Sequence, residues 1–184
     1  MTPRVSDEEL DRYARAARGG DGAAFEIACR ALADDVWRYC LALLGDQDLA
    51  VEAAQETFLR LVTAVRRYRG DGPFRVYTLV VARRAIAETL RRERRQRDRT
   101  APDAEPDRIL ADASGLVELE QLVAALPEPL RQAFVLTQVL GLPYERAADV
   151  AGCPVGTIRS RVFRARERLA AALQHTDVDE EPRR

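Results

Sequence analysis

Apolar residues recur every three or four positions through most of the chain, the spacing that places them on one face of an α-helix. The sequence shows no run of the apolar–polar alternation that is typical of a β-strand. Ser6 followed by Glu9 has the form of a capping box, which marks the start of a first helix. In the first half the pattern predicts helices at residues 6–19, 21–45, 47–68 and about 74–99, with a Gly/Pro loop at 69–74.

The composition changes between residues 100 and 115, where two prolines and several small and acidic residues break the apolar pattern. Such a segment predicts a flexible linker. Beyond it the pattern predicts shorter helices at 115–126, 129–140, 144–151 and 155–174. We therefore expect an all-α fold of two small helical domains, the second a four-helix domain with a helix-turn-helix. The expected boundaries are 1–99 for the first domain, 100–115 for the linker, 116–174 for the second domain and 175–184 for a disordered tail.

The last predicted helix combines a narrow apolar stripe with an arginine-rich outer side. A short amphipathic helix (144–150), a tight turn through Gly152 and then Pro154 precede it, which is the layout of a helix-turn-helix. In that motif the second helix enters the major groove of DNA, where an arginine fork can bond guanine O6 and N7 together. The apolar stripe predicted to face the core consists of Val155, Ile158, Val162, Ala165, Leu169 and Leu173.

Other interpretations of this helix stay open at the sequence level. An arginine-rich helix face is often a solvated surface with no ligand. Phe163 lies off the apolar stripe, so its ring predicts either a contact with a thymine methyl or sugar, or packing on a neighbouring helix.

A leucine among polar residues singles out the helix predicted at 47–68. Its core stripe is predicted to hold Ala54, Phe58, Leu61, Val62 and Val65. Leu59 lies about 120° from that stripe, beside Gln55 and Glu56. An exposed apolar side chain flanked by polar ones is typical of a protein-binding site, although a lone exposed leucine is also ordinary.

A third candidate surface follows, at the loop and the start of the next helix. Arginines precede the loop, aromatic residues follow it, and arginines continue along the helix to residue 99. Positive charge binds the nucleic-acid backbone, and aromatic rings stack on bases that have left the duplex. Alternatively, Phe74 and Tyr77 are core residues and the arginine run is a solvated helix end.

Composition excludes several kinds of chemistry. The chain has 29 basic residues, all of them arginine, so it lacks the lysine of a phosphate-binding loop or a Schiff base. Three cysteines without CxxC spacing and a single histidine, His175, predict neither a metal site nor a disulfide framework. Cys29 and Cys40 fit buried small apolar positions. No signal peptide or long apolar run is present, which predicts a cytoplasmic protein without membrane contact. Paired catalytic carboxylates, metal ligands and a phosphate-binding loop do not stand out, which predicts no cofactor and no enzymatic activity.

Taken together, these segments resemble the bacterial extracytoplasmic-function (ECF) sigma factors, a two-domain branch of the sigma-70 family. The resemblance covers roughly residues 8–174. It is carried by QETFLRL at 55–61, by FRVYTLVVARR at 74–84 with AETLRRERR at 87–95, and most specifically by residues 126–169.

The resemblance implies a promoter-specificity subunit whose partners are core RNA polymerase, through its β′ clamp helices and β flap, and promoter DNA. The residues that it places at the polymerase clamp are Gln55, Glu56, Phe58 and Leu59. Those that it places at the −10 element are Arg69, Asp71, Arg75, Tyr77, Arg83 and Arg84. Those that it places at the −35 element are Thr157, Arg159, Ser160, Arg161, Phe163 and Arg164. It also implies that the linker threads toward the polymerase active site.

Three positions depart from the family pattern in the −10 segment: Tyr77, where many members have tryptophan, Arg84 for asparagine and Glu88 for aspartate. The Asp-Leu-Val that often precedes the Gln-Glu pair is Glu-Ala-Ala here, at residues 52–54. Two exposed surfaces on one tether further suggest an anti-sigma factor as a partner. The alternative function is a helix-turn-helix repressor or activator, with residues 1–99 as a sensor or dimerisation module.

Overall fold

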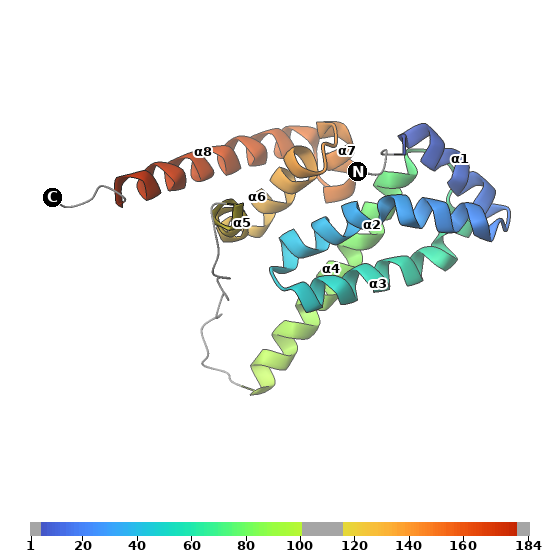
Figure 1. The fold of residues 1–184 in the computed structure, drawn as a ribbon, viewed down its shortest axis with the longest axis horizontal. Coiled ribbons are helices and arrows are strands. Elements are labelled where there is room, and N and C mark those ends of the chain that lie inside the picture. The colour runs from blue at the N-terminus through green and yellow to red at the C-terminus, as the bar shows by residue number, and fades with distance from the viewer. Residues whose placement is uncertain (1–4, 101–115, 180–184) are drawn as a thin grey trace.

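The computed structural model describes residues 5–100 and 116–179, and this part of the chain is helical, with no strand (Figure 1). We refer to residues 5–100 as the N-terminal half and to residues 116–179 as the C-terminal half. Residues 101–115 of the predicted linker lie outside the described residues, whereas Thr100 is the last residue of helix α4.

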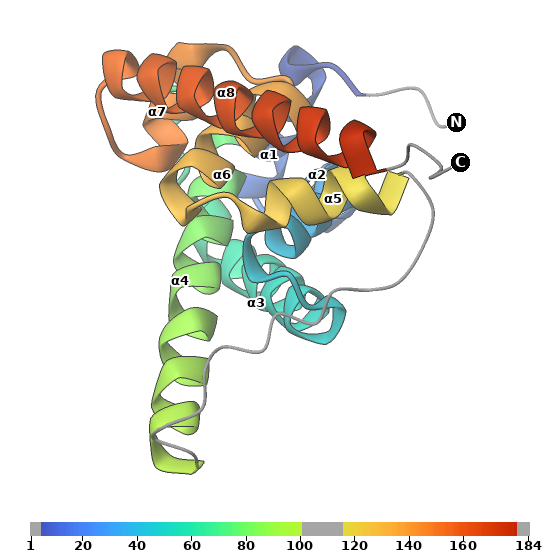
Figure 2. The same ribbon diagram turned by 90° about the vertical axis from the view of Figure 1, so that its left-hand side faces the viewer.

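The N-terminal half follows the predicted helices closely. Its elements are α1 (Asp7–Arg18), α2 (Gly22–Leu44), α3 (Gln47–Ala64), the short 3₁₀ helix η1 (Val65–Arg67) and α4 (Phe74–Thr100). The lower end of α4 projects beyond the other helices in both views (Figures 1 and 2).

Side-chain caps explain where these helices begin. The Ser6 hydroxyl accepts a hydrogen bond from the backbone N–H of Glu9, and the Glu9 carboxylate accepts one from the backbone N–H of Ser6, so the predicted capping box is confirmed. Asp21 and Asp46 cap α2 and α3 in the same way, through bonds to Ala24 and Leu49. Gly45 ends α2 in the left-handed conformation, with a φ of 69°.

The C-terminal half contains the predicted helices with one subdivision. Its elements are α5 (Leu116–Ala125), α6 (Glu128–Phe134), the π-helix η2 (Val135–Val139), α7 (Tyr144–Ala151) and α8 (Val155–Asp179). The single helix predicted at 129–140 thus divides into an α-helical and a π-helical part. Because α8 continues to Asp179, the first five residues of the predicted disordered tail are helical, and residues 180–184 lie outside the described residues.

Two buried clusters form most of the core. One lies within the N-terminal half and contains Leu10, Leu32, Leu61 and Phe74. The larger one joins both halves, because residues of α2 and α4 such as Val36 and Leu79 share it with Leu136, Leu140 and Val150. The two halves therefore pack against each other, with α6 and α7 lying against α2 and the upper part of α4 (Figure 2).

Two residues that the sequence assigned to core stripes are exposed. Val62 is 54% exposed on α3, and Leu173 is 45% exposed on α8. Val62 lies at the edge of the α3 stripe, where the other described helices leave it uncovered. Leu173 lies in the last turns of α8, which extend past the body of the C-terminal half (Figure 1).

Candidate protein and nucleic-acid interfaces

The outer face of α3 carries a row of exposed apolar side chains. Leu59 is 67% exposed, Val62 54% and Val51 44%. At 100° per residue these three positions and Gln55 fall within a sector of about 80° on the helix. The exposure predicted for Leu59 is confirmed, and it belongs to a larger apolar surface, which we call the α3 face (Val51, Gln55, Leu59 and Val62).

The residues predicted to bind polymerase differ in how accessible they are. Gln55 and Leu59 are exposed. Phe58 is only partly exposed and packs against both of these core clusters. Its ring therefore contributes mainly to the core and little to an exposed binding surface. The Glu56 carboxylate accepts a hydrogen bond from Arg60 Nε at 2.6 Å. The sequence analysis did not assign Val51 or Val62 to this surface. Val62 was counted with the core, because a helical wheel places it next to the core stripe.

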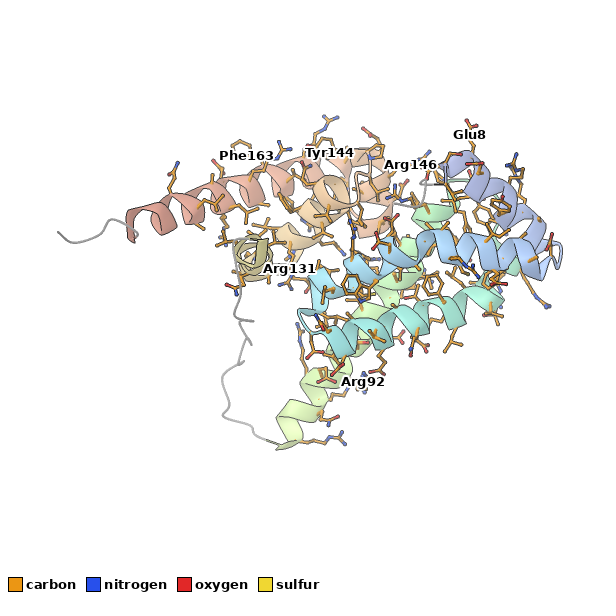
Figure 3. The ribbon with its side chains drawn as sticks, in the orientation of Figure 1. Glu8, Arg92, Arg131, Tyr144, Arg146 and Phe163 are labelled. Carbon is orange, nitrogen blue, oxygen red and sulfur yellow. The ribbon has the colours of Figure 1, made fainter. Side chains whose placement is uncertain are left out.

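Arginine–carboxylate pairs tie α3 to α4. Arg60 bonds both Glu56 on its own helix and Glu88 on α4. Arg92 of α4 makes a bidentate contact with Glu52 of α3, at 2.5 and 2.7 Å (Figure 3). Each arginine lowers the pKa of its partner carboxylate, Arg60 that of Glu88 and Arg92 that of Glu52. These pairs fix the α3 face relative to the arginine-rich α4.

Replacing Arg60 with methionine is expected to raise the pKa of Glu88 toward its ordinary value of 4.5, because the hydrogen bond to the guanidinium is lost. Since the pairing lowers the folded-state pKa, its contribution to stability is present above the ordinary pKa and is lost as the pH falls through the lowered one. An NMR titration of the Glu88 carboxyl measures the shift. Replacing Arg92 with methionine is the matched control and should raise the pKa of Glu52 while leaving that of Glu88 in place. An unchanged Glu88 pKa without Arg60 would contradict the pairing.

The loop before α4 is anchored by an aromatic cluster and one carboxylate. Tyr68, Phe74 and Tyr77 have ring centroids 5.1–6.1 Å apart. The Tyr77 hydroxyl donates to the carbonyl of Ala64 at 2.9 Å, so Tyr77 is partly buried and held in place. Asp11 of α1 accepts a 2.6 Å bond from the backbone N–H of Phe74. Sequence reasoning missed Asp11, because a contact across 63 residues leaves no local signal.

The predicted −10 residues fall into an exposed group and a covered group. Arg69, Asp71 and Arg84 are exposed. Arg75 is 8% exposed, and its guanidinium bonds Asp35 at 2.6 Å and the carbonyl of Leu140 at 2.7 Å. Arg83 is partly buried and donates to the carbonyl of Ala151 at 3.2 Å. The two covered arginines therefore contact the C-terminal half.

The predicted helix-turn-helix is formed by α7, a turn and α8. Gly152 ends α7 with a φ of 66°, and its backbone N–H donates to the carbonyl of Ala148 at 2.8 Å. Ile158, Val162 and Ala165 are almost fully buried, which confirms the centre of the predicted apolar stripe. The stripe fixes which side of α8 faces outward.

The outward side of α8 is basic and carries an exposed aromatic ring, and we call it the α8 face. Phe163 is 61% exposed and projects away from the body of the molecule, so the alternative that it packs on a neighbouring helix is not seen (Figure 3). Thr157 and Arg161 are partly buried, and Arg161 Nη1 lies 3.7 Å from Cys153 Sγ. The α8 face consists of the exposed residues Arg159, Ser160, Phe163 and Arg164.

Two further features of the described residues bear on other classes of function. No group of three or more His, Cys, Asp or Glu side chains there is arranged to hold a metal ion. Within the same residues, no helix combines the length and hydropathy needed to cross a bilayer. Cys40 is buried and Cys29 partly buried, as expected for small apolar positions, and burial raises the pKa of both thiols, to about 12 and about 11.

The sequence matches two described protein families in the two halves. Residues 29–96 match the family described as "Sigma-70 region 2" and residues 116–169 match "Sigma-70, region 4". The "Probable RNA polymerase sigma-C factor" of Mycobacterium bovis is 41% identical, over 97% of this chain and 99% of that protein. The "RNA polymerase sigma-H factor" of Pseudomonas aeruginosa is 32% identical, over 92% of this chain and 96% of that protein.

Solved structures share the fold at lower identity. The sigma factor RpoE of Bartonella quintana, in complex with the anti-sigma factor NepR, has a TM-score of 0.72 and 22% identity, over 82% of this chain and 96% of that chain. CnrH, in complex with the cytosolic domain of CnrY, has a TM-score of 0.72 and 21% identity, over 91% of this chain and 98% of that chain.

Proposed function

The chain belongs to the sigma-70 family as an ECF sigma factor. From this premise we propose which of its surfaces bind polymerase and which recognise the two promoter elements. It is a promoter-specificity subunit that binds core RNA polymerase and directs transcription initiation. Polymerase carries out the chemistry in the cytoplasm, and this subunit supplies recognition. The proposed units are residues 1–99 for polymerase binding and −10 recognition, 100–115 as linker and 116–174 for the −35 element.

The α3 face binds the β′ clamp helices of polymerase. An exposed apolar centre with polar residues at its edge is the usual composition of a protein interface. Leu59 is the most exposed of the large apolar side chains that the structure describes, and a rigid helix pre-organises it for docking. Gln55 and Glu56 orient the contact, and Phe58 holds the helix from beneath.

The loop at 69–74 and the start of α4 open and read the −10 element. Arg69 and Arg84, which are exposed, contact phosphates, and Asp71 belongs to the loop that captures a flipped base. The partly buried ring of Tyr77 stands where many members have tryptophan. Arg75 and Arg83 complete this surface once they are released from the C-terminal half.

The α8 face reads the −35 element in the major groove. Arg159 and Arg164 are exposed on it, and an arginine fork can bond guanine O6 and N7 together. Phe163 contacts a thymine methyl group or a sugar, and Ser160 contacts a base edge or a phosphate. Thr157 and Arg161, which are partly buried, border the same groove. The β flap of polymerase holds this half at the required distance from the first.

The observation that carries this function is the pair of exposed faces on separate parts of one chain, apolar on α3 and basic with an aromatic ring on α8. The alternative, a helix-turn-helix regulator with a sensor domain, is not favoured, because the N-terminal half matches sigma-70 region 2.

We also propose that an anti-sigma factor covers one or both faces. Copurification from the native host tests that partner, and a sigma factor that is always recovered alone would contradict it.

Run-off transcription with purified core polymerase tests the function. A promoter library from the native host should give defined start sites only when the full-length chain is added to core polymerase. The reaction without the chain is the control. The absence of any start site that depends on the chain would overturn the proposal.

A further inference from the structure

Exposed arginines continue along α4 beyond the positions assigned to the −10 element. Arg84, Arg91 and Arg95 are exposed, and at 100° per residue they fall within a sector of about 40° on the helix. None of the three forms an ion pair with a carboxylate in the part of the chain that the structure describes. We call these three residues the α4 ridge. It follows the part of α4 that projects beyond the other helices (Figures 1 and 2).

One carboxylate lies within reach of this ridge. Glu88 follows Arg84 by four residues and precedes Arg91 by three, the spacings at which side chains of one helix can pair. A guanidinium that is held by Glu88 is not available to a phosphate. An unpaired carboxylate at this position would also repel a phosphate directly. The charge of Glu88 therefore opposes any binding of an anion by the α4 ridge.

The structure shows Glu88 paired with another helix instead. Arg60 Nη2 of α3 bonds the Glu88 carboxylate, and Arg60 Nε bonds Glu56 at 2.6 Å. The bond from Arg60 is the main cause of the lowered pKa of Glu88, and the charge of Arg91 lowers it further. Because its Nε and Nη2 both bond carboxylates, Arg60 itself presents little free positive charge.

The composition of the α4 ridge favours the backbone of duplex DNA over an unpaired strand. Residues 78–100 contain no aromatic side chain, whereas proteins that bind single strands stack the bases on aromatic rings. At about 1.5 Å per residue, Arg84 and Arg95 are roughly 16 Å apart along the helix axis. That length is several times the spacing of about 3.4 Å between phosphates along one strand of a duplex.

We propose that Arg60 is a positioning residue for DNA binding, because by holding Glu88 against α3 it leaves the α4 ridge free to contact the phosphates of duplex DNA. The inference rests on the proposed assignment of Arg84 to DNA, and it extends that surface to Arg91 and Arg95. Arg60 acts through Glu88 and does not touch the DNA. Its role lies in the charge that it neutralises, in addition to any stability that it gives to the packing of α3 on α4.

Combining Arg60→Met with Glu88→Gln separates this role from a structural one. Arg60→Met frees the Glu88 carboxylate, which then pairs with Arg84 or Arg91 or repels the DNA. Glu88→Gln removes that charge whether or not Arg60 is present. It should therefore cancel the effect of Arg60→Met on DNA binding, which is the coupling that a double-mutant cycle measures.

The parent for all variants is the full-length chain with Arg159→Ala and Arg164→Ala, because the arginines of the α8 face would otherwise compete for the same DNA. Arg38→Met is the matched control. Arg38 pairs with Asp34 on α2 at 3.1 Å, so its replacement changes the net charge equally at a site outside the α4 ridge. Circular dichroism checks that each variant keeps its helix content.

The measurement is fluorescence anisotropy with a short labelled duplex of random sequence, over a series of salt concentrations. For Arg60→Met we expect an affinity about fivefold lower at low salt. The slope of log K against log salt should be shallower by about 0.9, the contribution of one phosphate contact on duplex DNA. Arg38→Met should match the parent. The double variant should bind as tightly as Glu88→Gln alone, and Glu88→Gln should bind at least as tightly as the parent.

Three results would overturn the proposal. The first is equal affinity of Arg60→Met and Arg38→Met, and the second is a parent chain without measurable affinity for the duplex at low salt. The third is a loss in Arg60→Met that Glu88→Gln does not restore, since Arg60 would then brace the two helices or contact the DNA itself.

If Arg60→Met loses helix content, Arg60→Ala replaces it under the same criteria, because alanine has the highest helix propensity. Run-off transcription by the native chain is a separate readout. Its failure would refute the proposed function whatever these affinities show.

Discussion

Replacing Leu59 with aspartate is expected to abolish transcription from every promoter alike, because the chain no longer associates with core polymerase. Leu59 is 67% exposed on the α3 face, so the described residues leave most of its apolar side chain uncovered. Truncating a central apolar side chain of an interface typically costs about 2 kcal/mol or more, roughly thirtyfold in affinity. A carboxylate buried there without a partner costs more still.

The measurement is the dissociation constant of the full-length chain for core polymerase, with run-off transcription on several promoters beside it. Ile27→Asp is the matched control, because Ile27 is an apolar side chain of α2 that is 44% exposed and lies outside the proposed interfaces. Leu59→Asp should keep its helix content and lose polymerase, whereas Ile27→Asp should keep both. Equal affinity of the two variants for core polymerase would remove the α3 face from the proposed function.

Replacing Arg159 and Arg164 with alanine is expected to reduce or redirect transcription without weakening the association with polymerase. Both arginines are exposed on the α8 face, and Arg159 Nη2 lies 4.0 Å from the Glu145 carboxylate of α7. Each bidentate contact with a base contributes about 1–3 kcal/mol of discrimination. If the two contributions add, the double variant loses about 2–6 kcal/mol, which is roughly thirtyfold or more in output from a promoter that depends on its −35 element.

Run-off transcription from promoters with an intact and a scrambled −35 element measures this loss. The Arg166→Ala variant is the control, because it also removes an arginine from α8, but one that bonds Gln138 at 2.6 Å and is not part of the α8 face. The output of the double variant should be similar on both promoters, while the Arg166→Ala variant should still distinguish them. A double variant that keeps the native preference for the intact element would show that the α8 face does not read it.

Local patterns explain why so much of the fold could be predicted from the sequence. The capping box at Ser6, the αL glycine at Gly152 and the buried stripe through Ile158 and Val162 each depend on residues a few positions apart. The helix-turn-helix and its outward face were predictable for the same reason. The exposure of Leu59 followed from the same helical geometry.

The features that the sequence did not reveal are contacts between distant segments. Arg75 bonds a backbone carbonyl 65 residues away, and every residue has such a carbonyl, so no side-chain type marks the partner. Asp11 anchors the loop from 63 residues away. Val62 was wrongly assigned to the core, because a helical wheel shows which way a side chain points but not how far the neighbouring helix extends over it. The assignments of individual residues to polymerase and DNA remain predictions.

The π-helix at Val135–Val139 has a consequence for how this chain tolerates insertions and deletions. A π-turn holds one residue more than the α-helical turn it replaces, so deleting one residue there restores a regular α-helix instead of breaking it. Because the wide turn absorbs that extra residue, Leu140 would keep nearly the same direction around the helix axis after the deletion. Its carbonyl would then stay within reach of Arg75, so the bond that joins the two halves is expected to survive a deletion of one residue at this position.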